Sequence, residues 1–264
     1  MSTDKASLSI RTVVFDIDDT LVPWDTVAHW QWAWHPNGPV LPERRVLPIL
    51  RRALHRWDRQ RWQALVGSAP VADEAAYRRH LDETLTQIAG HPLPPIEHEA
   101  VINRFVRPAG GVEPYPEAAR ALDQLRSMGV HVAAATGHPR SIAESMLRRA
   151  GLGPGLKVLA REDTGADALP HRKAFRSVCE QLESEPQATL FVGDLFWSDY
   201  RAAGRAGLNA LLMERATGPE RTEAARIHSL TEVAAHLTGP PPSMTPDTPP
   251  DRELPGPSTE VEPQ

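Results

Sequence analysis

The sequence contains little cysteine, little lysine and no long apolar run. A single cysteine, Cys179, excludes an intramolecular disulfide and a zinc site built from several cysteines. It falls in a helical pattern, which favours a small buried thiol over a reactive one. No apolar stretch has the length of a membrane-spanning helix, and residues 1–11 lack the hydrophobic centre of a signal peptide. We therefore expect a cytoplasmic protein with no membrane partner.

A strong excess of one charge is also absent from most of the chain. The 264 residues carry a net charge of −5, and residues 239–264 hold five acids against one arginine, which is about −4 of it. The remainder is nearly neutral, so the composition gives no support for a nucleic-acid partner. Residues 239–264 also hold nine prolines and no aromatic residue, a composition typical of a disordered tail.

Three acids follow a short apolar run near the start of the chain. A β-prone run over residues 10–15, with Ile10, Val13, Val14 and Phe15 as its apolar members, predicts a buried parallel strand, which is followed by Asp16, Asp18 and Asp19. Ligands of open α/β sheets bind beyond the carboxyl ends of the strands, so Asp16 and Asp18 would enter one cleft. Crowded carboxylates repel unless a cation or a shared proton compensates, and Mg2+ prefers such oxygen ligands. The alternative is a solvated loop or a helix N-cap.

The segment Asp16–Thr20 reads Asp-Ile-Asp-Asp-Thr and resembles the D-x-D-x-T signature of the haloacid dehalogenase-like (HAD) hydrolases, most of which are phosphatases. The resemblance implies an α/β fold with a Rossmann-like parallel sheet and a Mg2+ cofactor. It also implies three further motifs downstream.

The second motif follows a predicted strand over residues 130–135. This strand ends at Thr136 and Gly137, and a predicted helix follows over residues 141–150. A hydroxyl and free backbone N–H groups at such a junction form an anion site. The resemblance therefore implies that Thr136 and Gly137 bind phosphate.

The third motif calls for a lysine near the start of a helix, where its ammonium group balances carboxylates and phosphoryl oxygens. After a predicted strand over residues 156–160, Lys173 opens a predicted helix over residues 174–182, and we assign it this role. The common pattern K-P-D-P-x-x-F, aligned on Phe175, would place Leu169 there instead. Arg172 is the alternative, and Lys173 would then be an ordinary surface lysine.

The fourth motif follows a predicted strand over residues 189–192. Asp194 and Asp199 match G-D-x-x-x-x-D, which completes the HAD metal site. We expect Asp16, Asp194 and the backbone carbonyl of Asp18 to bind the metal. Asp199 would be a further ligand, the N-cap of a helix over residues 200–206, or both. A last strand is predicted over residues 209–213.

Residues 24–111 show helical periodicity and predict an insert of four helices, which resembles a C1-type HAD cap. Residues 8–23 and 112–238 would form the α/β core. Six of the seven tryptophans lie in or beside the insert, and packing explains most of them. Trp24 lies nearest the acidic strand, and we predict that it contacts substrate.

Taken together, the motifs predict a Mg2+-dependent phosphatase that acts on a small phosphorylated metabolite. The resemblance implies that Asp16 attacks phosphorus to give an aspartyl-phosphate and that Asp18 is the general acid and base. Thr136 and Lys173 would hold the phosphoryl oxygens.

Other reactions and roles stay open. Haloacid dehalogenases share the first aspartate but lack the acid two residues later, so Asp18 favours phosphate chemistry. A phosphomutase or phosphonate hydrolase is less favoured. The alternative from another class is a HAD-fold binding or regulatory protein that uses the tryptophan-rich insert or the proline-rich tail. The presence of all the acids of the first and fourth motifs disfavours this alternative.

Overall fold

The computed structural model describes residues 10–23, 58–59, 113–164, 172–215 and 224–238. The predicted helical insert, apart from Asp58 and Arg59, lies outside these residues. Trp24 and the predicted tail over residues 239–264 also lie outside them. The division into core and insert therefore stays a prediction.

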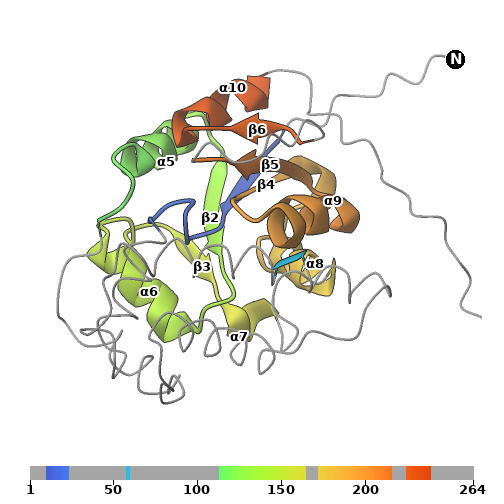
Figure 1. Cartoon of the computed structure of the whole chain (residues 1–264), viewed down its shortest axis with the longest axis horizontal. Helices are drawn as coiled ribbons and strands as arrows, with labels where there is room; N and C mark the ends of the chain where they lie inside the picture. Colours follow the sequence, from blue (N-terminus) through green and yellow to red (C-terminus); the bar gives the residue numbers. More distant parts are fainter. Residues whose placement is uncertain (1–9, 24–57, 60–112, 165–171, 216–223, 239–264) are drawn as a thin grey trace, which may run out of the picture.

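A parallel sheet of six strands forms the centre of the described part (Figure 1). The strand order is β3-β2-β1-β4-β5-β6, and every neighbouring pair is parallel. The strands are β1 Thr12–Phe15, β2 His131–Ala135, β3 Lys157–Leu159, β4 Thr189–Gly193, β5 Asn209–Met213 and β6 Arg226–Ile227. The chain moves outward in one direction from β1 to β3 and in the other from β4 to β6. Ligands of such sheets bind where the order reverses, which is between β1 and β4.

The strand β1 is buried on both faces because helices cover both sides of the sheet. Val13 and Phe15 pack into one apolar cluster with residues of the helices α5 (Ala118–Ser127), α6 (Arg140–Arg149) and α10 (Val233–Thr238). Val14 packs into another with residues of α8 (Arg172–Gln181) and α9 (Ala202–Ala206). All three side chains are fully buried. This explains why the strand is an uninterrupted apolar run, as is usual for parallel sheets.

Six α-helices and a π-helical turn are described. The bounds are α5 Ala118–Ser127, α6 Arg140–Arg149, α7 Arg161–Thr164, α8 Arg172–Gln181, the π-helix η3 Phe196–Arg201, α9 Ala202–Ala206 and α10 Val233–Thr238. Short 3-10 turns lie at η2 Pro186–Ala188 and η4 Leu230–Glu232. None of the described helices has the length and apolarity that crossing a membrane requires.

The α/β prediction is confirmed, and each predicted strand matches an observed one to within two residues at each end. The sequence analysis did not predict β6, α7 or α10, which are all short. Cys179 is only 3% exposed, as predicted, and burial raises the pKa of its thiol. Its sulfur lies 3.8 Å from the hydroxyl of Thr189.

Candidate active site

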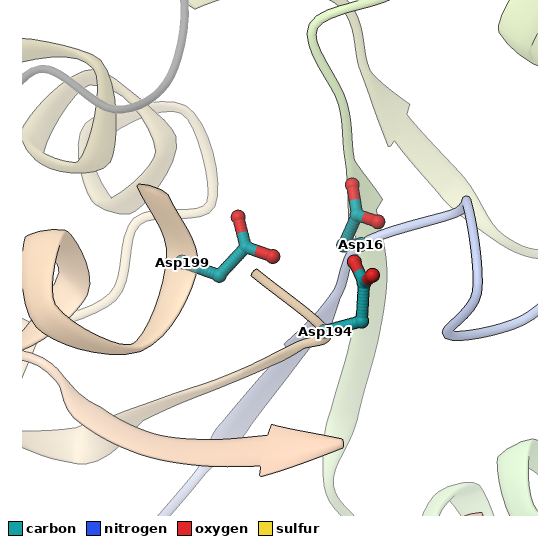
Figure 2. Close-up of side chains that lie close together, drawn as sticks. All are labelled: Asp16, Asp194 and Asp199. Carbon is teal, nitrogen blue, oxygen red and sulfur yellow. The ribbon is translucent and has the colours of Figure 1, made fainter. Parts of the chain in front are cut away.

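Asp16 and Asp194 follow adjacent strands and therefore meet at the carboxyl edge of the sheet. Phe15 pairs with Val192 in the β1–β4 register, and the backbone N–H of Asp16 donates to the carbonyl of Val192 at 2.8 Å. This bond extends the alignment one residue beyond β1. Carboxylate oxygens of Asp16, Asp194 and Asp199 lie within 4.8 Å of one another, and Figure 2 shows the three side chains converging.

Asp199 reaches this cluster from the π-helix η3. Its Oδ2 accepts the backbone N–H of Leu195 at 3.0 Å, and the side chain is buried. A Cβ on Gly193 would lie 2.6 Å from the Asp199 carboxyl carbon, so the close approach requires glycine there. The N-cap interpretation of Asp199 is wrong, because the helical turn already begins at Phe196 and Asp199 lies inside it. Such π-turns occur frequently at functional sites.

The three carboxyl groups lie close together, with Asp199 buried and Asp16 and Asp194 partly buried. Burial, then repulsion from the neighbouring acids, raises the pKa of Asp16 and of Asp194 well above the ordinary value. Burial is also the first cause that raises the pKa of Asp199, to about 8. Clustered buried carboxylates of this kind are stabilised by a bound cation, and an all-oxygen donor set suits a hard divalent ion. The residues therefore fit the predicted metal.

The side chain of Asp18 is near this cluster and contacts His138. The two side chains are joined by a contact of 2.6 Å between His138 Nε2 and Asp18 Oδ2, and each is 24% exposed. The attraction of Asp18, through its charge and its hydrogen bond, outweighs burial, so the pKa of His138 is raised. Asp18 Oδ1 is buried and has no hydrogen-bond partner among the described residues.

Thr136 lies directly beyond β2, the strand next to β1. It is 2% exposed, and its Oγ1 accepts the backbone N–H of His138 at 3.2 Å. The hydroxyl proton is therefore still available for donation. The carbonyl of Gly137 accepts Nε of Arg161 at 2.8 Å, which links this turn to the residues after β3.

Comparisons with known proteins identify the family of this chain. A family model described as haloacid dehalogenase-like hydrolase covers residues 10–207. The chain belongs to the haloacid dehalogenase-like hydrolases. It is therefore a hydrolase, and the recognition based on residues 16–20 is confirmed.

Two relatives of this HAD-like hydrolase bear phosphatase names. The chain is 31% identical over 240 residues to a plasmid phosphoglycolate phosphatase of Cupriavidus necator, covering 88% of this chain and 95% of the relative. It is 27% identical over 209 residues to glyceraldehyde 3-phosphate phosphatase of Methanopyrus kandleri, covering 78% and 84%. An L-2-haloacid dehalogenase of Xanthobacter autotrophicus has the same fold, with a TM-score of 0.59 and 19% identity over 87% of this chain and 99% of that one.

The structure does not bring the predicted third-motif lysine of this HAD-like hydrolase into the carboxylate cluster. Lys173 is exposed in the first turn of α8 and makes no hydrogen bond or ion pair with any described residue. Ala174 and Phe175 beside it are buried, because this amphipathic helix turns its apolar face toward the sheet. The assignment of Lys173, or of the adjacent Arg172, stays a prediction.

Two residues near the site were missed in the sequence analysis. His138 directly follows Thr136 and Gly137 of the second HAD motif. This closeness in the sequence could have marked it as a residue near the site. Asp58 lies within the predicted insert, is 2% exposed, and accepts the backbone N–H groups of Trp197 at 3.1 Å and Ser198 at 2.9 Å. The hydroxyl of Ser198 also donates to it. Asp58 therefore caps the start of the π-helix that carries Asp199. No pattern in the sequence around Asp58 predicts that contact.

A second group of side chains holds the turn after β1. The hydroxyl of Tyr115 donates to Asp19 Oδ1 at 3.0 Å, and its backbone N–H donates to the carbonyl of Leu21 at 3.0 Å. The guanidinium group of Arg215 stacks on the Tyr115 ring, 3.4 Å from its centroid, and donates to the carbonyl of Thr20 at 2.8 Å. Asp19 has a φ of 53°, which is uncommon for a residue with a side chain, and these contacts stabilise it.

Proposed function

We propose that this HAD-like hydrolase is a Mg2+-dependent phosphatase that acts on small phosphomonoesters through an aspartyl-phosphate at Asp16. The observation that carries the proposal is the convergence of Asp16, Asp194 and Asp199 at the switch point between β1 and β4, with Asp18 two residues beyond the nucleophile. The phosphatase names of the two relatives support the substrate class.

The metal would be held by the carboxylates of Asp16, Asp194 and Asp199, together with the backbone carbonyl of Asp18. When bound, Mg2+ supplies positive charge that neutralises the oxygens of the phosphoryl group. The hydroxyl of Thr136 donates a hydrogen bond to one of these oxygens.

In the first step, an Asp16 carboxylate oxygen attacks phosphorus in line with the leaving alcohol oxygen. The bond between phosphorus and that oxygen breaks as Asp18 transfers its proton to the alcohol. In the second step, Asp18 takes a proton from water, whose oxygen attacks phosphorus and releases phosphate from Asp16. A dehalogenase needs no acid to protonate a halide, so Asp18 favours phosphate ester cleavage over dehalogenation.

The test is phosphate release from a panel of phosphomonoesters, measured with Mg2+ and with EDTA, for the wild type and Asp16→Asn. We expect metal-dependent release that falls by about 10³-fold or more in Asp16→Asn, because the nucleophile is lost. The matched control is Asp123→Asn, since the Asp123 side chain on α5 is 74% exposed. Release that persists in Asp16→Asn, or halide release from 2-haloacids in place of phosphate release, would overturn the proposal.

A further inference from the structure

His138 is held rigidly beside the catalytic edge of the sheet. Its backbone N–H donates to Thr136 Oγ1 at 3.2 Å, and its carbonyl accepts the backbone N–H of Arg161 at 3.0 Å. The side chain of Arg161 binds the carbonyl of Gly137 at 2.8 Å. Hydrogen bonds therefore hold the turn between β2 and α6 both before His138 and at its own carbonyl group. A side chain on such a support can impose an orientation on its partner.

The contact between His138 and Asp18 distinguishes the two oxygens of the Asp18 carboxyl group. Oδ2 lies 2.6 Å from Nε2 of the ring. With the ring proton assigned to Nε2, Oδ2 is the acceptor, and the other oxygen, Oδ1, carries any proton that Asp18 donates. Oδ1 is buried and lacks a hydrogen-bond partner among the described residues. Leaving a buried polar atom without a partner is costly, and such atoms in folded proteins call for an explanation.

We propose that His138 is a positioning residue, which anchors Oδ2 of Asp18 so that Oδ1 faces the oxygen of the leaving group. This inference rests on the phosphatase function proposed above. As the Asp16 oxygen bonds to phosphorus, the electron pair of the breaking P–O bond goes to the leaving oxygen, and the Oδ1 proton passes to that oxygen. Asp18 is left as a carboxylate that still accepts the N–H of His138. In the second step the water proton returns to Oδ1.

The role predicts a dependence on the leaving group. A basic phenolate needs a proton as it leaves, whereas 2,4-dinitrophenolate leaves without one. Misplacing a general acid costs about 10²-fold where its proton is needed. Loss of the His138 contact should therefore slow the cleavage of phenyl phosphate and spare 2,4-dinitrophenyl phosphate. A change that only loosens the fold would slow the cleavage of both.

The experiment measures kcat/KM of the full chain with Mg2+ for phenyl, 4-nitrophenyl and 2,4-dinitrophenyl phosphate. We expect His138→Ala to lose about 10²-fold on phenyl phosphate and less than about threefold on 2,4-dinitrophenyl phosphate. His138→Gln can place an amide N–H near Nε2, so it should recover most of the loss. His131→Ala, which changes an exposed histidine in β2, is the matched control and should not alter the dependence.

A double-mutant cycle separates this role from a structural one. If His138 acts through Asp18, His138→Ala should have little further effect in the Asp18→Asn background. Equal losses on all three esters, additive effects in the cycle, or no loss in His138→Ala would overturn the positioning role while Asp16→Asn remains inactive. The absence of Mg2+-dependent release from every ester by the wild type, or full activity of Asp16→Asn, would overturn the phosphatase function itself.

Discussion

The metal-free protein should lose stability as the pH rises, because Asp199 stays protonated in the folded state at pH values where the unfolded chain is ionised. The pKa of Asp199 is raised from its ordinary value of 3.8 to about 8, chiefly by burial. Below pH 4 the group is protonated in both states and has no effect. Between pH 4 and pH 8 only the unfolded chain releases the proton, so ionisation favours unfolding. Above pH 8 the destabilisation is complete.

The magnitude follows from the width of this window. About four pH units at about 1.4 kcal/mol each give a loss of up to about 5 kcal/mol in the free energy of unfolding. Asp199→Asn removes the titrating group and keeps an oxygen that can accept the N–H of Leu195. In EDTA, the variant should therefore be the more stable protein at pH 8, and the difference should shrink toward pH 5.

The assay is urea unfolding in EDTA between pH 5 and pH 8.5, followed by tryptophan fluorescence, with Asp123→Asn as the matched control. Mg2+ at about 100 times its Kd should stabilise the wild type by about 2.7 kcal/mol. It should stabilise Asp199→Asn much less. A difference between wild type and variant that stays constant over this pH range would refute the reasoning, as would equal stabilisation of both by Mg2+.

Two further substitutions test how the cluster is built. Gly193→Ala places a Cβ against the Asp199 carboxyl group, and calorimetric titration should show Mg2+ affinity reduced by about tenfold or more. Gly137→Ala, whose Cβ would meet no atom within 4 Å, should retain the affinity; equal losses in both would contradict this explanation. Asp58→Ala removes the carboxylate that accepts two backbone N–H groups of the π-helix and should cost about 2–4 kcal/mol in urea unfolding. Asp58→Asn keeps an acceptor and should cost less, and a loss below about 0.5 kcal/mol for Asp58→Ala would show that solvent replaces the carboxylate.

The parts of the fold that were predicted correctly rest on local signals. The strands β1, β2 and β4 are largely apolar runs that are followed by a polar residue, and parallel pairing brings such ends to one edge of the sheet. This reasoning alone places Asp16 beside Asp194. The direction in which a single side chain points depends on tertiary packing and not on the neighbouring sequence alone. The start of the helix that holds Lys173 was predicted to within two residues. The Lys173 side chain is nevertheless exposed, because packing of Ala174 and Phe175 on the sheet sets the rotation of the helix about its axis.

The contacts that were missed join residues far apart in the chain. His138 lies 120 residues from Asp18, and Asp58 lies 139 residues from Trp197. Each depends on how a turn or an insert packs in three dimensions, which no spacing rule encodes. The N-cap alternative for Asp199 is wrong for a related reason. A π-turn is wider than an α-turn, and its start at Phe196 puts Asp199 inside the turn rather than before it.

The hydrogen bond between Tyr115 and Leu21 has a consequence for how this protein can diversify. The two crossings that join residues 24–112 to the sheet leave and return side by side, so the sheet meets this long segment as it would meet a short surface loop. We expect that changes of length or sequence in this segment leave the strand ends that carry the acids in place. Asp58 limits this freedom, because a replacement without an equivalent carboxylate would leave the start of the π-helix uncapped. We therefore expect that changes in the predicted insert can be accommodated at the carboxyl edge of the sheet when the contact of Asp58 with the π-helix is preserved.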